Sequence, residues 1–419
     1  MSSTIDQDET AVPTFSVAER DRRWDLAREF MSREGLDALL VFGEHEDAGP
    51  APFNYDTWFT NGRAGTTVIF PRKGEPVSLL PMEMFTKDHL ESARRGDTLW
   101  MAPENLRMFR DSRVVTATLN ELGLAKAAVG VVGLEGFPPW HPEGIVPYRF
   151  WTNVLAAFPA ATFTLVGTAL SRLIMPLGPE EIAVVRHSAR IGDAMVRAMA
   201  ETAAGVPESE VYAAGMAAGY ARGTTPAAMH FWTGPDPLAR GLPPWSHRPQ
   251  APRVLQDGDI VSAEVFSNAA GRHTQHQVTI TIGEPHEDLL RAADVARAAY
   301  DAGLSALRSG RTFGDAVADI RKPCAAAGGW EFGPAVHTLN PTIAASGFPG
   351  HSMAGADAYP AEDDHPTMAA DMELEPGMTF ALEPNYVYGR HLAYLGGTVI
   401  VGDDGAIELN PYTAQLLRA

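Results

Sequence analysis

Hydrophobic and polar positions in the first part of the chain alternate between helical and strand spacing. The segment SVAERDRRWDLAREFMSREGLDALLVFG begins with Ser16 as a candidate helix N-cap, keeps apolar residues near helical spacing, and passes through Gly35 into the run ALLVF. Further strand-like runs follow in GTTVIFP, PVSLLP, AAVGVVGLE and ATFTLVG, separated by helical patterns. This alternation predicts an α/β domain over residues 16–170.

The chain from residue 171 onward follows a different order, with long helical patterns before most of the strand patterns. After a hinge that contains Pro and Gly, an amphipathic helix and a second helix, ESEVYAAGMAAGYARG, precede a strand-rich stretch. The pattern predicts an α+β domain over residues 171–419, in which helices cover one side of a curved antiparallel sheet. Its expected later elements are strands within 253–283, helices near 286–309 and 312–327, and the closing strands GMTFALEP and GGTVIVGDDGAIEL.

Charge and composition narrow the function classes. The chain has 33 Lys and Arg against 52 Asp and Glu, for a formal net charge of −19, which repels nucleic acid and anionic membrane surfaces. Its one cysteine, Cys324, excludes an internal disulfide and a thiolate metal site and is typical of a reducing, cytoplasmic compartment. No run approaches the roughly 18 apolar residues of a membrane helix. Residues 1–15 are polar and acidic, so we expect a disordered arm there and no secretory signal.

The most polar of the strand patterns is SAEVFSNAAGRHTQHQVTITIG, which alternates like two strands around a turn. It carries Glu264, His273, Gln275, His276 and Gln277. Because successive side chains of a strand point to opposite faces, we expect His273 and His276 on different faces. We interpret His276 as structural, whereas structural and functional roles are equally supported for Gln277.

Three other stretches place polar residues on strand or loop backgrounds. They are PPWSHRPQ with His247, GFPGHSMAGADAYP with His351, and GMTFALEPNYVYGRH with Glu383. Taken singly, such residues more often face water than take part in chemistry. In AAMHFWTG, Phe231 and Trp232 are candidates to line an apolar substrate pocket, and His230 is expected to support a loop or pocket wall. Three further histidines are expected at the surface or just outside the site: His337, His365 and His391.

The order of these stretches resembles the family of creatinase, prolidase, aminopeptidase P and methionine aminopeptidase. The matching motifs are SRLIMPLGPEEIAVVRHSARI, QDGDIVSAEVF with AGRHTQHQVTITIG, PGHSMAG, and LEPGMTFALEP with GGTVIVGDDG. In the first part, REGLDALLVF and YDTWFTNGRAGTTVIFP resemble the smaller domain that precedes the catalytic domain in creatinase and prolidase. The resemblance implies an α/β N-terminal domain followed by an α+β catalytic domain of the pita-bread (creatinase/aminopeptidase-like) fold.

Metal-dependent members of this family hold two ions with two Asp, one His and two Glu. By resemblance of the motifs, the two Asp positions fall here on Glu264 and Gln275, and the His position falls on His351. The first Glu position falls on Glu383, and the second falls on Leu395 or Gly396. Two divalent ions need their charge offset by carboxylates, and of the family's carboxylates only those of Glu264 and Glu383 remain. We therefore expect a site without metal or other cofactor. The open alternative is a single weakly bound ion held by Glu264, His273, His351 and Glu383.

Two metal-free members supply further resemblances. In creatinase a catalytic His lies twelve residues before the Asp of a GD turn, as His247 lies twelve residues before Asp259. Creatinase also has the GHS that stands here around His351. In ectoine hydrolase a Glu and a His nine residues later match Glu264 and His273.

The chemistry of the side chains suggests roles for these residues. With His273 close across the hairpin, Glu264 could act as a general base toward water or as a nucleophile. His247 is suited to protonate a leaving nitrogen, because an imidazole titrates near neutral pH. The remaining expected roles are substrate orientation by His351 and Glu383 and neutral hydrogen bonds from Gln275 and Gln277.

The sequence thus predicts a metal-independent hydrolase that cleaves a C–N bond in a small amidine, guanidino or amide substrate. Three alternatives stay open: a metal-dependent Xaa-Pro aminopeptidase or prolidase, a lyase on the same fold, and a catalytically inactive binding module. We expect a small-molecule substrate, no nucleic acid or membrane partner and, by resemblance, a homodimer.

Overall fold

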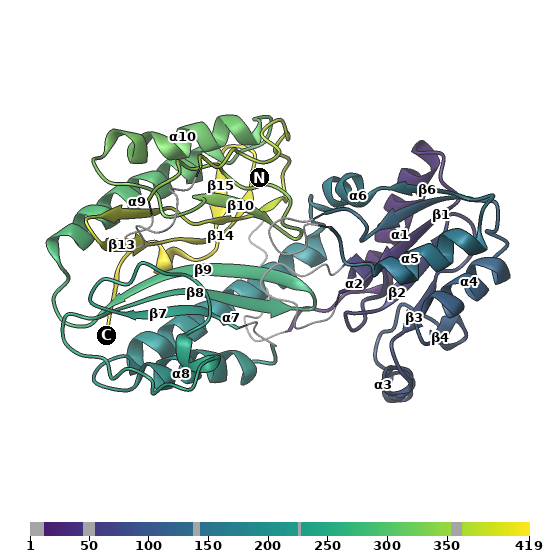
Figure 1. Cartoon of the computed structure of the whole chain (residues 1–419), viewed down its shortest axis with the longest axis horizontal. Coiled ribbons are helices and arrows are strands. Elements are labelled where there is room, and N and C mark those ends of the chain that lie inside the picture. The colour runs from purple at the N-terminus through teal and green to yellow at the C-terminus, as the bar shows by residue number, and fades with distance from the viewer. Residues whose placement is uncertain (1–11, 45–54, 137–142, 225–227, 353–362) are drawn as a thin grey trace. The chain divides into compact units, whose positions relative to one another are not determined.

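The computed structural model describes residues 12–44, 55–136, 143–224, 228–352 and 363–419. It forms two compact units, one of Thr14–Ile174 and one that contains Met175–Ala419 (Figure 1). The sequence placed this division at residues 170 and 171. Of the predicted arm, residues 1–11 lie outside the described ranges, and Phe15 is buried with its ring 6.1 Å from that of Trp100. Within the described ranges, no helix is long and apolar enough to cross a membrane.

A six-stranded sheet with the order β4-β3-β2-β1-β5-β6 forms the centre of the N-terminal unit. As predicted, Ser16 caps the first helix, because its Oγ accepts a 3.1 Å hydrogen bond from the backbone N–H of Glu19. The strands are β1 (Ala38–Phe42), β2 (Thr67–Pro71), β3 (Val77–Leu80), β4 (Leu106–Met108), β5 (Ala128–Val132) and β6 (Thr162–Leu165). The helices are α1 (Val17–Arg33), α2 (Tyr55–Thr60), α3 (Glu83–Arg95), α4 (Ser112–Glu121), α5 (Tyr148–Ala157) and α6 (Gly167–Ile174).

The second unit has two four-stranded sheets, with the orders β16-β9-β8-β7 and β10-β11-β14-β15, and a two-stranded sheet β12-β13. The strands are β7 (His230–Gly234), β8 (Ile260–Ala269), β9 (Arg272–Thr281), β10 (Val336–Leu339), β11 (Thr379–Leu382), β12 (Asn385–Tyr388), β13 (His391–Tyr394), β14 (Gly397–Val401), β15 (Ala406–Glu408) and β16 (Leu417–Arg418). The helices are α7 (Pro179–Thr202), α8 (Glu208–Tyr220), α9 (Glu287–Ala306) and α10 (Phe313–Ala326).

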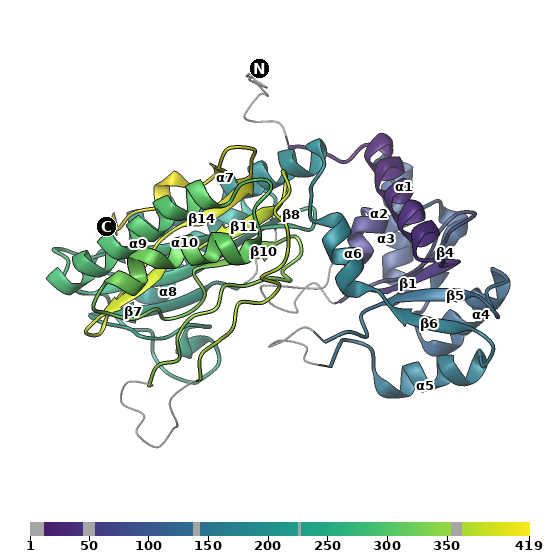
Figure 2. The same ribbon diagram turned by 90° about the horizontal axis from the view of Figure 1, so that it is seen from above.

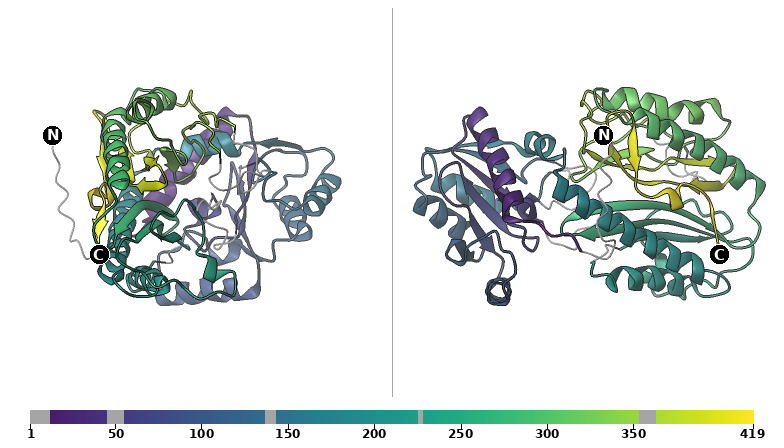
Figure 3. Two further views of the ribbon diagram at one scale, coloured as in Figure 1. Left: turned by 60° about the vertical axis from the view of Figure 1, so that its left-hand side comes forward. Right: turned by 180° about the vertical axis from the view of Figure 1, so that it is seen from behind.

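Helices cover the outer side of each main sheet of this unit. Helix α7 runs along the β7–β9 strands with α8 beside it (Figure 3). On the opposite side, α9 and α10 lie next to each other and pack on the other strands (Figure 2). The prediction of one curved sheet with helices on one side is thus refined: two main sheets stand inside, each with its own helical layer.

The β8–β9 hairpin sets the register of the polar residues that the sequence singled out. In it Glu264 stands opposite Gln277, and Phe266 stands opposite Gln275. Side chains of paired residues share a face of the sheet, so Glu264, Gln275 and Gln277 all project from one face. The apolar residues of the alternate positions project from the other face and pack in the core with α7 and α8.

The two main sheets meet where β9 passes the chain just before β14. The backbone N–H of Gln277 donates a 3.2 Å hydrogen bond to the carbonyl of Gly396, and that of Gln275 donates to Thr398 Oγ1 at 2.9 Å. Gly396 has a φ of +122°, and a Cβ atom there would lie 2.1 Å from the carbonyl oxygen of Leu382. Glycine is therefore required at this junction, which brings the polar face of the hairpin against the end of β11.

Candidate active site

Glu264 lies in the middle of β8, between β7 and β9. His230 stands directly opposite on β7, and its Nδ1 lies 2.9 Å from Glu264 Oε2. The hydroxyl of Tyr394 donates a hydrogen bond to Glu264 Oε1. Arg240 Nε approaches the same oxygen at 3.4 Å. Because the Glu264 side chain is only 6 % exposed, these three groups largely replace water around its carboxylate.

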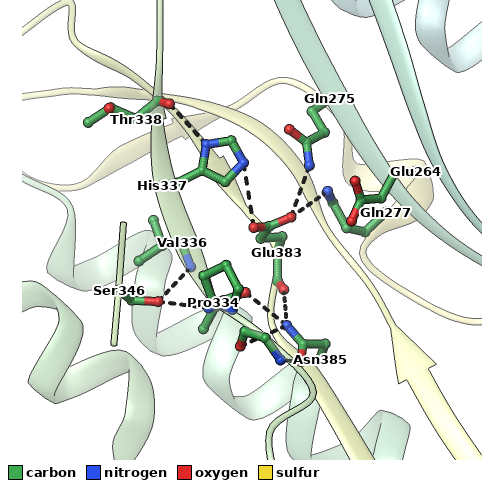
Figure 4. Close-up of polar contacts among 12 residues, drawn as sticks. Glu264, Gln275, Gln277, Pro334, Val336, His337, Thr338, Ser346, Glu383 and Asn385 are labelled. Carbon is green, nitrogen blue, oxygen red and sulfur yellow. Dashed lines mark hydrogen bonds and ion pairs between the residues drawn. The ribbon is translucent and has the colours of Figure 1, made fainter. Parts of the chain in front are cut away.

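A second buried carboxyl group, that of Glu383, follows β11 and lies close to the first (Figure 4). Gln275 Nε2 donates a 3.0 Å hydrogen bond to Glu383 Oε2, and Gln277 Nε2 donates one of 2.8 Å to the same oxygen (Figure 4). The Tyr394 hydroxyl lies 3.2 Å from this oxygen. Tyr394 therefore contacts both acidic side chains and links them.

His337, on β10, reaches the other oxygen of Glu383. Its Nε2 lies 3.5 Å from Glu383 Oε1, and its Nδ1 lies 2.9 Å from the carbonyl oxygen of Thr338 (Figure 4). A carbonyl oxygen only accepts hydrogen bonds, so Nδ1 carries the hydrogen. Burial lowers the pKa of His337, which favours the neutral ring. Nε2 of that neutral ring then presents a lone pair to Glu383.

The two buried carboxyl groups differ in charge. Burial acts to raise the pKa of Glu264, but the Arg240 cation, with help from His230 and Tyr394, outweighs it and lowers this pKa to about 2. For Glu383, burial and then the negative charge of Glu264 raise the pKa well above its ordinary value. The surroundings of the two acids therefore push their pKa values in opposite directions, which is the arrangement expected of a proton acceptor paired with a proton donor.

The structure contradicts the predicted pairing of Glu264 with His273. His273 stands opposite Asn268, four residues nearer to the hairpin turn than the pair of Glu264 and Gln277. The sequence showed the alternation of the hairpin but not its register, which decides the cross-strand neighbour. The histidine that contacts Glu264 is His230, which had been expected only to support a loop or pocket wall.

We expect His273 to make the fold sensitive to acid. Burial and then the neighbouring Arg272 cation lower the pKa of His273 to about 4, whereas the unfolded chain exposes an imidazole with a pKa of about 6.5. Between these values the unfolded state binds more protons, so the free energy of unfolding falls as the pH is lowered from about 6.5 to about 4. Urea unfolding at several pH values across this range should show that the acid-induced decrease in the free energy of unfolding is about 2 kcal/mol smaller in H273Q than in the wild type. The same acid-induced loss in both proteins would contradict this assignment.

His276 points away from the site, as predicted for a structural residue. It is fully buried, and its Nε2 lies 3.2 Å from the carbonyl oxygen of Ala189 in α7. A Cβ atom at Gly192 would lie 2.0 Å from the His276 ring, so the glycine makes room for the imidazole. Gln277, on the opposite face, contacts Glu383, which favours the functional interpretation of that residue.

Two of the predicted catalytic histidines are exposed. His247 follows the short helix η2 (Pro244–Ser246), and its Nδ1 lies 3.4 Å from Ser246 Oγ. The ring of His351 stacks on that of Trp330 with centroids 4.0 Å apart. The described polar contacts of Glu264 and Glu383 include neither residue, and the histidine beside Glu383 is His337. The catalytic roles of His247 and His351 therefore stay predictions.

Only one of the two predicted pocket aromatics projects from the face that carries Glu264. Trp232 lies two residues after His230 on β7 and shares its face. Phe231 projects from the other face, is fully buried, and packs with its ring 5.6 Å from that of Tyr212 in α8. The prediction that Phe231 lines the substrate pocket is wrong, because the alternation of β7 directs it into the core.

Four site residues were missed: His230, Arg240, His337 and Tyr394. His230 carried a usable signal, since it directly precedes the aromatic pair Phe231 and Trp232 that the sequence singled out for the pocket. Arg240 stands in a loop that had no expected element, and His337 and Tyr394 come from segments far away in the chain; Tyr394 and Glu264, for example, are 130 residues apart. No local pattern of hydrophobic and polar residues indicates such a contact.

The ligand positions of the metal-dependent relatives are altered here in ways that do not fit two divalent ions. The amide of Gln275 donates its NH₂ group to Glu383, so it offers no oxygen atom to an ion on that side. No liganding side chain fits at Gly396, because the Leu382 carbonyl occupies the space. The alternative position, Leu395, is buried in the apolar core.

Arg240 is a second reason why two divalent ions do not fit this site, because it brings a fixed positive charge within 3.4 Å of Glu264. Among the described residues, one group of three His, Cys, Asp or Glu side chains has its possible metal-ligand atoms all within 4.8 Å of one another. This group does not include Glu264 or Glu383. It consists of His286, Asp288 and His391.

Comparison with known proteins identifies the relatives of this chain. A model of metallopeptidase family M24 matches residues 183–408, more than half of the chain. Creatinase from a Bacillus species is 25 % identical over 395 residues, which cover 90 % of this chain and 85 % of creatinase. "Probable dipeptidase PepE" of Mycobacterium bovis is 31 % identical over 173 residues. That match covers 41 % of this chain and spans less than half, 42 %, of the relative.

Solved structures support the same fold. An X-Pro aminopeptidase from Thermotoga maritima has a TM-score of 0.70 at 14 % identity, over 94 % of this chain and 99 % of that chain. Dipeptidase PepE from Mycobacterium ulcerans has a TM-score of 0.68 at 22 % identity, over 96 % and 99 % of the two chains. The predicted fold class, an α/β domain followed by a pita-bread domain, is confirmed. This chain belongs to metallopeptidase family M24.

Proposed function

We propose that this protein is a metal-independent hydrolase that cleaves a C–N bond in a small amide, amidine or guanidino substrate. The observation that carries the proposal is the pair of buried carboxyl groups of Glu264 and Glu383, which the Tyr394 hydroxyl links beside the guanidinium of Arg240. Their pKa values are shifted in opposite directions, so Glu264 serves as the ionised partner and Glu383 as the protonated one. Such a pair supplies a proton acceptor and a proton donor without a metal ion. Similarity to creatinase over most of the chain supports a C–N bond as the target.

The first step in this proposal is the attack of water. Glu264 orients a water molecule at the electrophilic carbon of the substrate. The water oxygen donates an electron pair to that carbon, and the proton it releases passes to Glu264. His230 holds Glu264 Oε2 from β7, so the carboxylate keeps one orientation during the transfer.

The second step is the departure of the nitrogen. The electron pair of the breaking C–N bond goes to nitrogen, which takes up the proton of Glu383. His337 and the two glutamine amides hold Glu383 in place for this transfer. Tyr394, which contacts both acids, then gives its hydroxyl proton to Glu383 and accepts the proton of Glu264. This exchange restores both carboxyl groups for the next cycle.

Metal content and chelator resistance test the proposal. We expect elemental analysis of the purified protein to find substoichiometric transition metal. Hydrolysis of the best substrate from a panel of small amides, amidines and guanidino compounds should continue unchanged after treatment with a chelator. Two equivalents of metal per chain, together with loss of activity on their removal, would rule out the metal-independent mechanism.

A second candidate function is a metal-dependent dipeptidase or Xaa-Pro peptidase with an altered ligand set. The similarity to the PepE sequence favours it, because that relative is named as a dipeptidase. This function predicts cleavage of dipeptides, Xaa-Pro dipeptides among them, that is stimulated by Mn²⁺ or Co²⁺ and lost with chelator. The same panel and metal analysis separate it from the leading proposal.

A further inference from the structure

Arg240 is an unusual neighbour for a catalytic carboxylate. Its side chain is 27 % exposed, and its Nε lies 3.4 Å from Oε1 of Glu264. Yet neither Nε nor Nη2 has a hydrogen-bond partner among the residues that the structure describes, and both atoms are buried. An arginine kept for a structural ion pair usually forms short, forked hydrogen bonds with its carboxylate. Arg240 thus places its positive charge beside Glu264 but does not form such forked hydrogen bonds with it.

The fold provides a dedicated place for this guanidinium. Arg240 Cζ lies 4.8 Å from the ring centroid of Tyr394 and 5.4 Å from that of Phe332, within the range of cation–π attraction. At Gly333, an added Cβ atom would lie 2.8 Å from Nη1 and 2.9 Å from Nη2. A side chain at residue 333 would therefore displace the guanidinium, and the glycine keeps the space open.

We infer that Arg240 is the resident cation of this site: its guanidinium stands beside Glu264 in the place of a divalent ion and keeps such ions out. The positive charge is then part of the chain and cannot dissociate. A divalent ion bound at Glu264 would meet this charge at close range, in surroundings that screen it poorly. The inference deepens the proposed function and rests on it for its catalytic meaning.

Metal binding to Arg240 variants tests the inference without any substrate. Mn²⁺ alone serves as the probe, in equilibrium dialysis followed by elemental analysis of the wild type, R240A, R240K and the double variant R240A/E264Q. We expect the wild type and R240K, which retain a cation, to bind no Mn²⁺ at this site. R240A should bind one additional equivalent, with a Kd at least about 100-fold below the highest Mn²⁺ concentration at which the wild-type site stays empty. R240A/E264Q should lose that equivalent, which locates the ion at Glu264.

A matched control separates charge from general damage. Arg253 also pairs with a buried acid, Asp259, but through two short hydrogen bonds of 2.7 and 2.9 Å to its carboxylate oxygens. R253A is expected to lower the melting temperature and to gain no Mn²⁺. Thermal melting shows whether each variant is folded, and R240Q, which keeps much of the side-chain volume, replaces R240A if that variant does not fold.

Two outcomes would overturn the role of Arg240. One is equal Mn²⁺ binding by the wild type and R240A, and the other is the absence of binding by the folded neutral variants. Failure of the proposed function has a different signature, namely a wild-type protein that binds no Mn²⁺ at this site and yet hydrolyses none of the panel compounds, while R240A gains Mn²⁺ as expected. The dialysis result and the chelator result therefore judge the two proposals separately.

Discussion

Replacing Glu264 by glutamine is expected to lower kcat by at least about 10²-fold while the protein stays folded. The amide has nearly the shape of the carboxylate and retains one oxygen for the Tyr394 hydroxyl, but it cannot take a proton from water. It also leaves the Arg240 cation without its negative partner. Steady-state kinetics on the best substrate of the hydrolysis panel, with a thermal melt of the same sample, measures both effects.

Two variants give the controls for this substitution. E264D keeps the charge but moves the carboxylate away from His230, so we expect a kcat between those of the wild type and E264Q. D259N neutralises another buried, arginine-paired acid, which lies just before β8, and should lower stability without lowering kcat. An unchanged kcat in E264Q, or an equal loss in D259N, would contradict a direct role of Glu264.

Replacing Glu383 by alanine is expected to lower the free energy of unfolding by about 2–6 kcal/mol, besides reducing activity. The reason is that Gln275 and Gln277 both donate hydrogen bonds to Glu383 Oε2 inside the protein. Without an acceptor, each buried NH₂ group costs about 1–3 kcal/mol. Urea unfolding at neutral pH measures this difference.

E383Q is the matched control for stability. Its side-chain oxygen can still accept from both glutamine amides, so we expect a loss below about 1.5 kcal/mol. Activity should nonetheless fall, because an amide cannot supply the proton that the leaving nitrogen takes from Glu383. Equal stability of E383A and the wild type would mean that the two amides find other partners and that Glu383 does not organise the site.

Much of the architecture could be predicted from the sequence because it depends on local patterns. The cap at Ser16, the α/β order of the first unit and the two strands around the turn at residues 270–271 follow from the spacing of apolar residues and the positions of polar and glycine residues. The same alternation separated His276 from the face that carries Glu264. It also contained the information that Phe231 and Trp232 must point to opposite sides, although both had been assigned to the pocket.

The motifs carried information about the site as well. They singled out Glu264 and Glu383, which the structure brings to one buried cluster, and they showed which acidic positions of the metal-dependent relatives are changed here. The physical reason for one change appears only in three dimensions. Gly396 lies against the carbonyl of Leu382, so a side chain is excluded by the backbone of another strand.

The sequence by itself determined the order of elements, the faces of the strands and the two acidic residues of the site. Only the tertiary structure decided which groups surround those acids. Arg240 lies in a loop, His337 on β10 and Tyr394 on β13, and their contacts depend on how the sheets and loops come together. Local hydrophobic spacing specifies which face a side chain takes, whereas partners distant in the chain are chosen by strand register and packing. For this reason the acids could be found in the sequence, but not the arginine, histidine and tyrosine side chains that surround them.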